Sequence, residues 1–358
     1  MDTKGLLFIP DISGFTKFVN QTAIEHSKHI IEELLDTIIN ANRLGLQVSE
    51  IEGDAILFYK FGEAPPLKEL RDQVEAMFIA FHRHLKNYET RRICNCGACC
   101  TAVNLTLKFI SHAGEFTGYQ VKDFYKLLGK DVILAHQLLK NDIPEHEYWL
   151  ATDSLFSPVK VNGDLINWQQ GEKKSDEDVI PFHYTMLSAL KEKVKAEPPP
   201  DVLIKSKIVK VIESDADIDA DINTVFNTIT DTSLRPKFVA GVLAVDQESH
   251  KINRLGAQHR CVLQKETNVL ITSGISRSPE KITLSETNDK KTMHCNYILD
   301  RIHENKTHIK TEYFIKKNPI VQLVFSLFVK KKLTAVLAES NKNLNELCRK
   351  RMLQPAPL

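Results

Sequence analysis

Two short segments of the chain place a carboxylate where an apolar run ends or turns. Residues 8–16, FIPDISGFT, end an apolar run at Asp11 and break at a glycine. Residues 51–58, IEGDAILF, are an apolar strand interrupted by a Gly-Asp turn at Asp54. Mg²⁺ prefers one or two carboxylates together with substrate phosphates. The pair predicts a site where Asp11 and Asp54 hold a hard cation against a phosphate; alternatively, Asp11 caps the next helix and Asp54 occupies an ordinary hairpin turn.

The elements that would position these carboxylates alternate between strands and helices. The hydrophobic spacing predicts a buried strand at 5–10, a helix at 26–42, a hairpin at 46–59 and a helix at 67–88. Further on it predicts strands at 105–111, 148–152 and 179–184, a charged loop at 171–178, and a helix after Gly129 that runs to Lys140. This order is typical of an α+β or α/β sandwich.

The same two segments resemble the catalytic domain of class III nucleotidyl cyclases. Members of that family begin with a strand close to F-x-D-I-S-G-F-T and carry a Gly-Asp hairpin next. The resemblance covers residues 3–190 and implies a ferredoxin-like α/β sandwich. It implies that Asp11, Asp54 and the carbonyl of Ile12 bind Mg²⁺ or Mn²⁺. It also implies that a nucleoside triphosphate binds in a homodimer whose two chains each supply half of a site.

The family's transition-state donors are missing. The family pattern G-x-x-V-N-x-A-x-R-L matches GKDVILAHQL, which begins at Gly129. Ile133 replaces the Asn and Gln137 replaces the Arg. Ile cannot donate a hydrogen bond, and an Arg at this kind of position can be worth several orders of magnitude in phosphoryl transfer. The resemblance therefore indicates a nucleotide site whose catalysis is divergent or lost.

Nearby basic side chains are the candidate replacements for those donors. They are Lys126, Lys130 and His136, which alternatively are solvated surface residues. At the positions that read the base in the family, this chain has Glu50 and Lys126, the reverse of the adenine pattern, and an ion pair between them would serve equally well. By the resemblance, the nucleotide contacts are Phe15, Thr16, Glu50, Lys126, Ile133 and Gln137.

Two further motifs lie near the predicted strand at 105–111. Cys94, Cys96, Cys99 and Cys100 crowd into seven residues and offer a zinc site, a redox-sensitive cluster or merely small loop residues. Adjacent Cys99 and Cys100 can hardly both bind one ion without strain. The segment 112–114, HAG, matches an H-x-G of the family, where the glycine would permit a tight turn.

Composition excludes some classes of protein. The chain has 358 residues, 42% hydrophobic and 26% charged, with a formal net charge of +1. No bulk charge points to nucleic acid or to an anionic membrane. The longest apolar run, 319–329, is interrupted by polar residues and too short to span a bilayer. The chain begins without a basic-then-apolar signal segment, and the clustered cysteines fit a reducing compartment, so we expect a cytoplasmic protein.

The second half of the chain forms another pattern. A Lys-rich spacer with three prolines at 198–200 separates residues 1–190 from residues 206–358, so we take 191–205 as a linker. After it come a strand at 207–214, short helices capped near Asp221 and ending by Phe238, and strands at 242–248, 259–263, 269–273, 281–286, 293–299 and 308–315. A long helix from Pro319 to Met352 closes the chain.

The final helix carries apolar residues with helical spacing, which predicts a face packed on the sheet. They are Val321, Leu323, Val324, Leu327, Phe328, Leu333, Val336, Leu337, Leu344 and Leu347. Three lysines of the same helix, 330–332, are interpreted as part of its solvated face. This order of elements, with A-x-I-x-x-V-F from Ala220 and RPKF from Arg235, resembles the polyketide-cyclase branch of the START/Bet v 1-like helix-grip superfamily. The resemblance implies a cavity for a small apolar ligand; alternatively, the core is filled and serves only packing and interaction.

Three functions follow from these observations. The first is an active but divergent nucleotidyl cyclase. The second is a nucleotide-binding module without turnover that is coupled to the helix-grip half. The third is a protein for an apolar ligand or lipid whose cyclase-like half is a scaffold. The second and first are favoured over the third.

Overall fold

In the computed structural model, the chain divides into two compact units. The first comprises Met1–Thr90 and Gly97–Glu197, and the second comprises Arg91–Cys96 and Pro198–Leu358. The structure describes residues 3–20, 24–94, 96–156, 167–174, 179–196, 208–247, 254–264 and 266–353. The three prolines of the expected linker lie outside the described residues. The assignment of residues 91–96 to the second unit has no counterpart in the sequence pattern.

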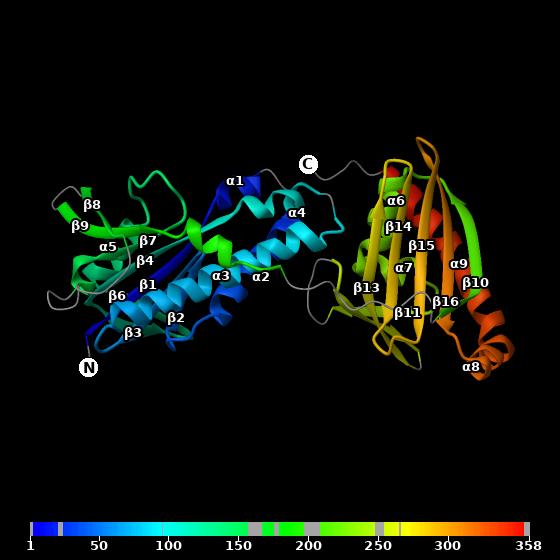
Figure 1. The fold of residues 1–358 in the computed structure, drawn as a ribbon, viewed down its shortest axis with the longest axis horizontal. Coiled ribbons are helices and arrows are strands. Elements are labelled where there is room, and N and C mark those ends of the chain that lie inside the picture. The colour runs from blue at the N-terminus through cyan, green and yellow to red at the C-terminus, as the bar shows by residue number, and fades with distance from the viewer. Residues whose placement is uncertain are drawn as a thin grey trace. The chain divides into compact units, whose positions relative to one another are not determined.

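The first unit is built on one mixed sheet with the strand order β2-β3-β1-β4-β7-β9-β8 (Figure 1). Its only parallel pair among the described strands is β4 with β7. The strands are β1 (Lys4–Ser13), β2 (Gln47–Glu52), β3 (Ala55–Phe61), β4 (Thr106–Glu115), β7 (Tyr148–Thr152), β8 (Gln169–Lys174) and β9 (Val179–Met186). The helices are α1 (Phe15–Asn20), α2 (Ile24–Asn40), α3 (Leu67–Arg91), α4 (Gly97–Thr101) and α5 (Lys130–Gln137).

The alternation of side chains along β1 decides which face of the sheet carries chemistry. Leu7 and Ile9 pack in a core cluster with Val132 and Ala135 of α5. Successive side chains of a strand point to opposite faces, so Asp11 shares the face of Leu7 and Ile9. The site therefore lies on the side of the sheet that α5 covers.

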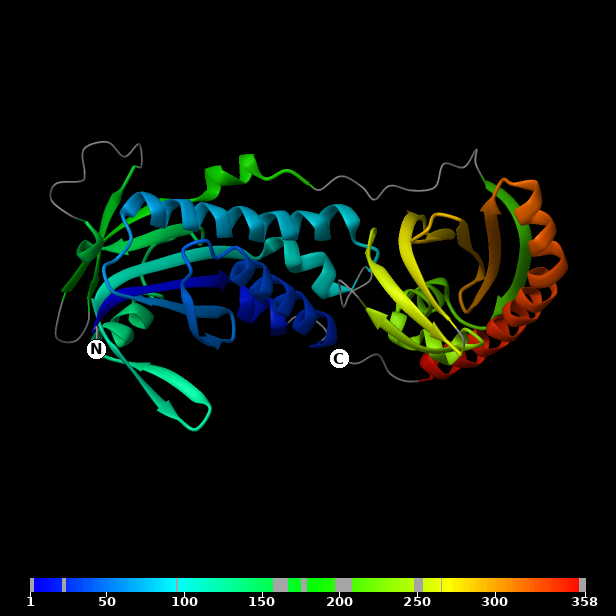
Figure 2. The same cartoon turned by 90° about the horizontal axis from the view of Figure 1, so that it is seen from below.

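A two-stranded hairpin, β5 (Thr117–Val121) and β6 (Phe124–Leu128), leaves the sheet before α5 and extends away from it (Figure 2). The strands predicted at 5–10, 105–111 and 179–184 are longer in the structure, because their ladders continue past the apolar runs. The loop predicted at 171–178 is wrong over β8. That charged segment pairs with β9 as an edge strand, where polar side chains face solvent on both sides.

The second unit is a seven-stranded antiparallel sheet with the order β10-β16-β15-β14-β13-β12-β11. The sheet is curled, and the long C-terminal helix α9 packs along its β10 strand (Figure 2). The strands are β10 (Ile208–Ile218), β11 (Val242–Gln247), β12 (Gln258–Leu263), β13 (Thr267–Arg277), β14 (Lys281–Asn288), β15 (Met293–His303) and β16 (Lys306–Lys316). The helices are α6 (Ile222–Thr230), α7 (Arg235–Phe238), α8 (Pro319–Val324) and α9 (Lys330–Met352), with a π-helical segment, Phe325–Val329, between the last two.

The final helix runs from Pro319 to Met352 as predicted, but its apolar residues do not all face the sheet. Leu337 and Leu344 are buried, whereas Leu327 and Phe328 are exposed. Within residues 319–329 only Phe325 packs in a buried cluster, and the other apolar side chains of this segment stay outside the core. No helix in the described ranges combines the length and the apolar character that crossing a bilayer requires.

Candidate functional site

The two predicted carboxylates lie on neighbouring strands and influence each other. Asp11 of β1 is paired in register with Ala55, the residue that follows Asp54. The backbone N–H of Ile12 donates to the carbonyl of Asp54 at 3.0 Å, which fixes the hairpin turn against the end of β1. Burial, and then the charge of Asp11, raise the pKa of Asp54 to about 6. Two carboxylates that repel each other in a half-buried position are what a divalent cation would neutralise.

Lys108 of β4 supplies a positive charge at this place, and the sequence analysis missed it. Lys108 stands opposite Asp11 in the β1–β4 ladder, and its Nζ lies 2.9 Å from Asp11 Oδ2. The same ammonium donates to the carbonyl of Leu139 at 3.2 Å, just beyond α5. It also acts to lower the pKa of Asp54. Lys108 therefore balances part of the carboxylate charge, and a cation bound at Asp11 would compete with it.

Tyr148 of β7 closes the buried side of the site. Its hydroxyl accepts a hydrogen bond from Asn141 Nδ2 at 2.7 Å. Burial raises the pKa of Tyr148, Lys108 opposes that rise, and Asp11 adds to it. The phenol of Tyr148 therefore interacts electrostatically with both Asp11 and Lys108. Polar residues of β1, the β2–β3 turn, β4 and β7 thus gather on the face of the sheet that α5 covers.

The residues at the predicted base-reading positions bind each other. Lys126 Nζ of β6 forms an ion pair with Glu50 Oε2 of β2. The ion pair that the sequence offered as an alternative to base contact is therefore present. His136 Nδ1 of α5 lies 3.9 Å from Glu52 Oε2, on the same hairpin. Two of the three candidate replacement donors thus face carboxylates of β2.

The other residues of the predicted nucleotide site line the outer side of α5 and the start of α1. Ile133 is 61% exposed, and Gln137 and Lys130 are exposed as well. Phe15 is half-buried, and a Cβ placed on Gly53 would lie 3.7 Å from its ring. Phe15 therefore lies against the turn that carries Asp54, while the neighbouring Thr16 is exposed. Gly53 has φ of +63°, which favours glycine at this turn.

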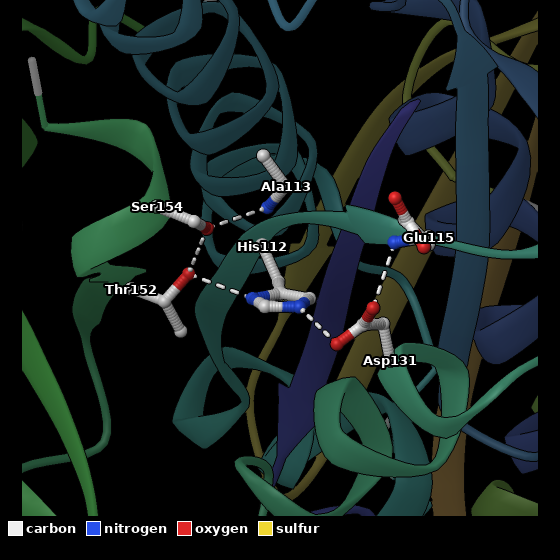
Figure 3. Close-up of polar contacts among 6 residues, drawn as sticks. All are labelled: His112, Ala113, Glu115, Asp131, Thr152 and Ser154. Carbon is white, nitrogen blue, oxygen red and sulfur yellow. Dashed lines mark hydrogen bonds and ion pairs between the residues drawn. The ribbon is translucent and has the colours of Figure 1, made fainter. Parts of the chain in front are cut away.

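A partly buried hydrogen-bond network fixes α5 to the sheet (Figure 3). His112 Nε2 lies 3.1 Å from Asp131 Oδ1 and its Nδ1 lies 2.8 Å from Thr152 Oγ1. Asp131 Oδ2 also accepts from the backbone N–H of Glu115 at 2.7 Å. Ser154 Oγ, which contacts Thr152, accepts from a backbone N–H of β4. These hydrogen bonds therefore hold the first turn of α5 against the ends of β4 and β7.

The position of Asp131 in this hydrogen-bond network also explains the glycine in the segment 112–114. The expected tight turn at Gly114 is wrong, because β4 continues to Glu115. A Cβ on Gly114 would lie 2.4 Å from Asp131 Cγ, so only glycine lets that carboxylate approach the strand. His112 connects Asp131 to Thr152 through its two ring nitrogens. Asp131 gave no signal beyond its place in the first turn of a helix.

The cysteine segment brings together a set of ligand groups that includes a histidine. Nδ1 of His26 lies 3.5 Å from Sγ of Cys99. One ligand atom from each of His26, Cys94, Cys96 and Cys99 lies within 4.8 Å of the others. Cys100 is not in this group, which agrees with the strain expected for adjacent ligands. The sequence could not indicate His26, because it lies far from the cysteines along the chain.

The second unit contains its own buried charges. Arg235 of α7 donates from Nη1 and Nη2 to the two carboxylate oxygens of Glu286 on β14, at 3.1 and 2.5 Å. Both side chains are at least 97% buried. Nε2 of His259 lies 3.6 Å from the same carboxylate. Burial and then the charge of Arg235 lower the pKa of His259 to about 4, so its imidazole is neutral at pH 7. An apolar ligand in this unit would meet a polar interior at this point.

Part of the chain matches the profile of a family of unknown function, and its structure is similar to those of several cyclases. The family profile "Protein of unknown function (DUF2652)" matches residues 31–148. The chain is 34% identical over 121 residues to "Uncharacterized protein Rv2561/Rv2562" of Mycobacterium tuberculosis (strain ATCC 25618 / H37Rv). That match covers 34% of this chain and 56% of the relative, so the chain spans about half the length of the curated relative it matches.

Solved structures similar to the chain include adenylyl and guanylyl cyclases. The adenylyl cyclase CyaB from P. aeruginosa has 16% identity and a TM-score of 0.39, over 52% of this chain and 96% of that one. The guanylate cyclase domain of RhGC from Catenaria anguillulae, in complex with GTP, has 16% identity and a TM-score of 0.36, over 51% and 96% of the two chains.

Proposed function

We propose that the first unit binds a nucleoside triphosphate together with Mg²⁺ or Mn²⁺, and that Asp11 and Asp54 hold the metal. The observation that carries the proposal is the meeting of these two carboxylates at the end of β1, where the charge of Asp11 contributes to the raised pKa of Asp54. The donor set fits the metal, since hard divalent cations take carboxylate oxygens and complete their shell with phosphate and water. The carbonyl of Ile12 is the further proposed ligand. When bound, the metal would neutralise phosphate charge.

The protein side chains around the metal would have distinct parts in this binding. Lys108 holds Asp11 in the absence of a cation and would shift when one binds. Phe15, whose ring lies beside the Asp54 turn, and the neighbouring Thr16 would contact the phosphate or ribose. The Glu50–Lys126 pair offers both a hydrogen-bond acceptor and a donor to a base. We leave the base unspecified, because the same pair is also complete by itself.

We infer binding without turnover as the main function. Catalysis of nucleotide cyclisation needs donors aimed at the phosphoryl oxygens as charge develops there. Ile133 has no donor, and Gln137 carries no charge. Lys126 and His136 face Glu50 and Glu52, so using them as donors would require breaking those contacts. The alternative, an active divergent cyclase, therefore depends on Lys130, which is exposed at the start of α5.

A homodimer is part of this proposal. Exposed apolar side chains gather on the β5–β6 hairpin and on the outer side of α5 in the first unit. They are Tyr119, Val121, Tyr125, Leu128 and Ile133. Large exposed apolar surfaces are typical of protein interfaces. A second copy would cover them and bring its own α5 to the nucleotide.

Thermal unfolding with each of the four common nucleoside triphosphates and Mn²⁺ tests the function. Both tryptophans, Trp149 and Trp168, lie in the first unit, so their fluorescence reports its unfolding. A ligand that binds only the native state at about 100 times its Kd stabilises by about 2.7 kcal/mol. We expect one nucleotide to stabilise the wild type in this way and not Asp54→Asn, with no pyrophosphate release. Release that depends on Asp54 would establish the cyclase instead, and no stabilisation by any nucleotide would contradict both.

We further propose that His26, Cys94, Cys96 and Cys99 bind Zn²⁺. Three thiolates and one imidazole are a common structural zinc set with four ligands. The support is the convergence of their ligand atoms within 4.8 Å. Such a site is closed, so it would stabilise the protein and take no part in chemistry. The alternative hypothesis of a redox-sensitive cysteine cluster becomes secondary, because bound zinc would protect the thiolates from oxidation.

Metal analysis of the purified protein checks the zinc proposal. We expect about one zinc ion per chain in the wild type and in Cys100→Ser, since Cys100 lies outside the ligand set. We expect much less in Cys99→Ser and in His26→Ala. A strong chelator should lower the melting temperature of the wild type, because binding free energy of a structural metal contributes to folding. Equal zinc in Cys99→Ser and wild type would contradict the proposal, as would a metal-free wild type after growth with zinc.

A further inference from the structure

The start of the final helix shows its apolar face to solvent. Ile320, Leu323, Val324, Leu327 and Phe328 are 73, 61, 49, 67 and 76% exposed. Their spacing of three and four residues places them on one side of a helix. Phe325, on the other side, is buried against Ile212, Ile315 and Leu337. In residues 319–329 Phe325 is therefore the one buried residue, and the apolar stripe faces outward, the reverse of an ordinary surface helix.

This segment is well formed and begins at a defined cap. Asn318 accepts hydrogen bonds from the backbone N–H groups of Ile320 and Val321, at 2.9 and 3.3 Å. Pro319 occupies the first helical position, which favours helix initiation. The π-helical turn at Phe325–Val329 lets one helix continue into α9 while Phe325 points inward. The stripe is consequently held in place, and no described element of the second unit covers it.

Lysines flank the stripe at both ends. Lys316 and Lys317 precede the helix and Lys330, Lys331 and Lys332 follow it, all exposed. Among the described residues, none of these five forms an ion pair with the protein. The sequence contains no Asp or Glu between Glu312 and Glu339. The patch of residues 316–332 is therefore apolar at its centre and positively charged at its ends.

We propose that the patch of residues 316–332 binds the surface of an anionic lipid membrane. A helix with an apolar face and flanking basic residues lies in the plane of the interface, with the face among the acyl chains and the lysines at the headgroups. Juxtamembrane basic residues each add favourable interaction with anionic lipid. The lysine charge favours this occupant over a second copy of the chain, because two copies would bring two sets of five lysines together. The apolar segment, residues 319–329, is too short to span a bilayer, so the binding is peripheral and reversible.

Vesicle sedimentation tests the proposal with the full chain. The probes are phosphatidylcholine vesicles alone and the same vesicles with about 30% phosphatidylserine. We expect the wild type to bind the anionic vesicles, to bind the neutral ones at least about tenfold more weakly, and to be released as salt rises. Leu327→Glu combined with Phe328→Glu should lose binding by about tenfold or more, since both side chains are exposed and carry no folding role. Changing Lys330, Lys331 and Lys332 to Gln should weaken binding to anionic vesicles only.

The matched control is Leu243→Glu, an apolar residue of the same unit that is 60% exposed on β11. It should bind vesicles like the wild type. Equal binding by the Leu327→Glu/Phe328→Glu variant would overturn the proposal, as would no binding by the wild type. Sedimentation velocity adds a second test. A wild-type dimer that the double variant converts to monomer, without vesicle binding, would assign the patch to a second copy and also overturn the proposal.

Discussion

Glu286→Gln should destabilise the second unit by about 3–5 kcal/mol, because it leaves the guanidinium of Arg235 buried and unpaired. Arg235 is 3% exposed and Glu286 is 1% exposed, and two hydrogen bonds join them. Burial acts to raise the pKa of Glu286, but the charge of Arg235, its hydrogen bonds and further contributions from His259 and Tyr297 together outweigh burial, so the pKa falls. Gln keeps the shape of Glu and removes its charge, so packing stays nearly constant while the charge balance is lost.

The control for this experiment is Glu280→Gln in the same unit. The side chain of Glu280 is 74% exposed and lies 3.7 Å from Arg301. Exposed ion pairs contribute about 0–1 kcal/mol, so this variant should unfold like the wild type. Arg235→Met combined with Glu286→Leu should recover most of the loss, because apolar residues of similar volume can replace a buried pair.

Urea unfolding followed by far-UV circular dichroism measures these effects, with tryptophan fluorescence as an internal reference. Since both tryptophans lie in the first unit, the fluorescence midpoint should stay unchanged in every variant. The circular dichroism transition should move to lower urea in Glu286→Gln alone. A Glu286→Gln protein that unfolds at the wild-type midpoint would show that Arg235 finds another partner and that the pair is not needed.

Lys108→Met should tighten the binding of Mn²⁺ in the presence of nucleotide by about tenfold or more. In the structure, Lys108 Nζ lies 2.9 Å from Asp11 Oδ2, and the side chains of the two residues are 15% and 12% exposed. A unit charge at such a distance interacts with the carboxylate by about 6 kcal/mol at an effective dielectric constant of 20, and a metal bound at Asp11 must replace part of that interaction. Removing the ammonium frees Asp11 for the metal, and Met keeps the length and apolar stem of Lys.

The effect of Lys108→Met should depend on pH in a defined direction. Burial and the charge of Asp11 raise the pKa of Asp54 to about 6, and Lys108 opposes that rise. Without Lys108 the carboxyl should hold its proton to higher pH, so metal binding in the variant should weaken more steeply as pH falls. Lys60→Met is the control, because Lys60 is a half-buried lysine of β3 that donates to the carbonyl of Leu44. Titration of Mn²⁺ at pH 7.5 and at pH 6 measures both effects. Weaker Mn²⁺ binding by Lys108→Met at the higher pH would show that Lys108 supports the metal rather than competing with it.

Hydrophobic spacing predicted most of the fold because the elements around the site have strong local signals. The helix predicted at 67–88 is α3, the strand at 148–152 is β7, and the final helix has the predicted ends. The edge strand β8 was missed, since a charged strand at the edge of a sheet has no apolar alternation to reveal it. Which residues of the last helix are buried also escaped prediction, because the spacing defines a face without showing where the sheet ends.

Some residues of the candidate site were likewise visible in the sequence, whereas others required the structure. Asp54 directly follows Gly53 and Asp11 lies three residues before Gly14, so their places in a turn and near the end of a strand were visible in the sequence. Lys108 and Tyr148 lie within apolar strands, and only the register of β4 and β7 brings them to Asp11. His26 joins the cysteines from a separate helix, which spacing along the chain cannot show. Contacts that depend on strand register or on distant segments need the three-dimensional structure.

The central claim is that Asp11 and Asp54 form a metal-dependent nucleotide site. Isothermal titration calorimetry with the manganese complex of the best-stabilising nucleoside triphosphate, on wild type and Asp54→Asn, tests it most directly. We predict saturable binding to the wild type that disappears when manganese is withheld, and at least about a hundredfold weaker binding to the variant, which lacks one of the two anionic ligands. Equal affinity in wild type and Asp54→Asn, with or without manganese, would contradict the account.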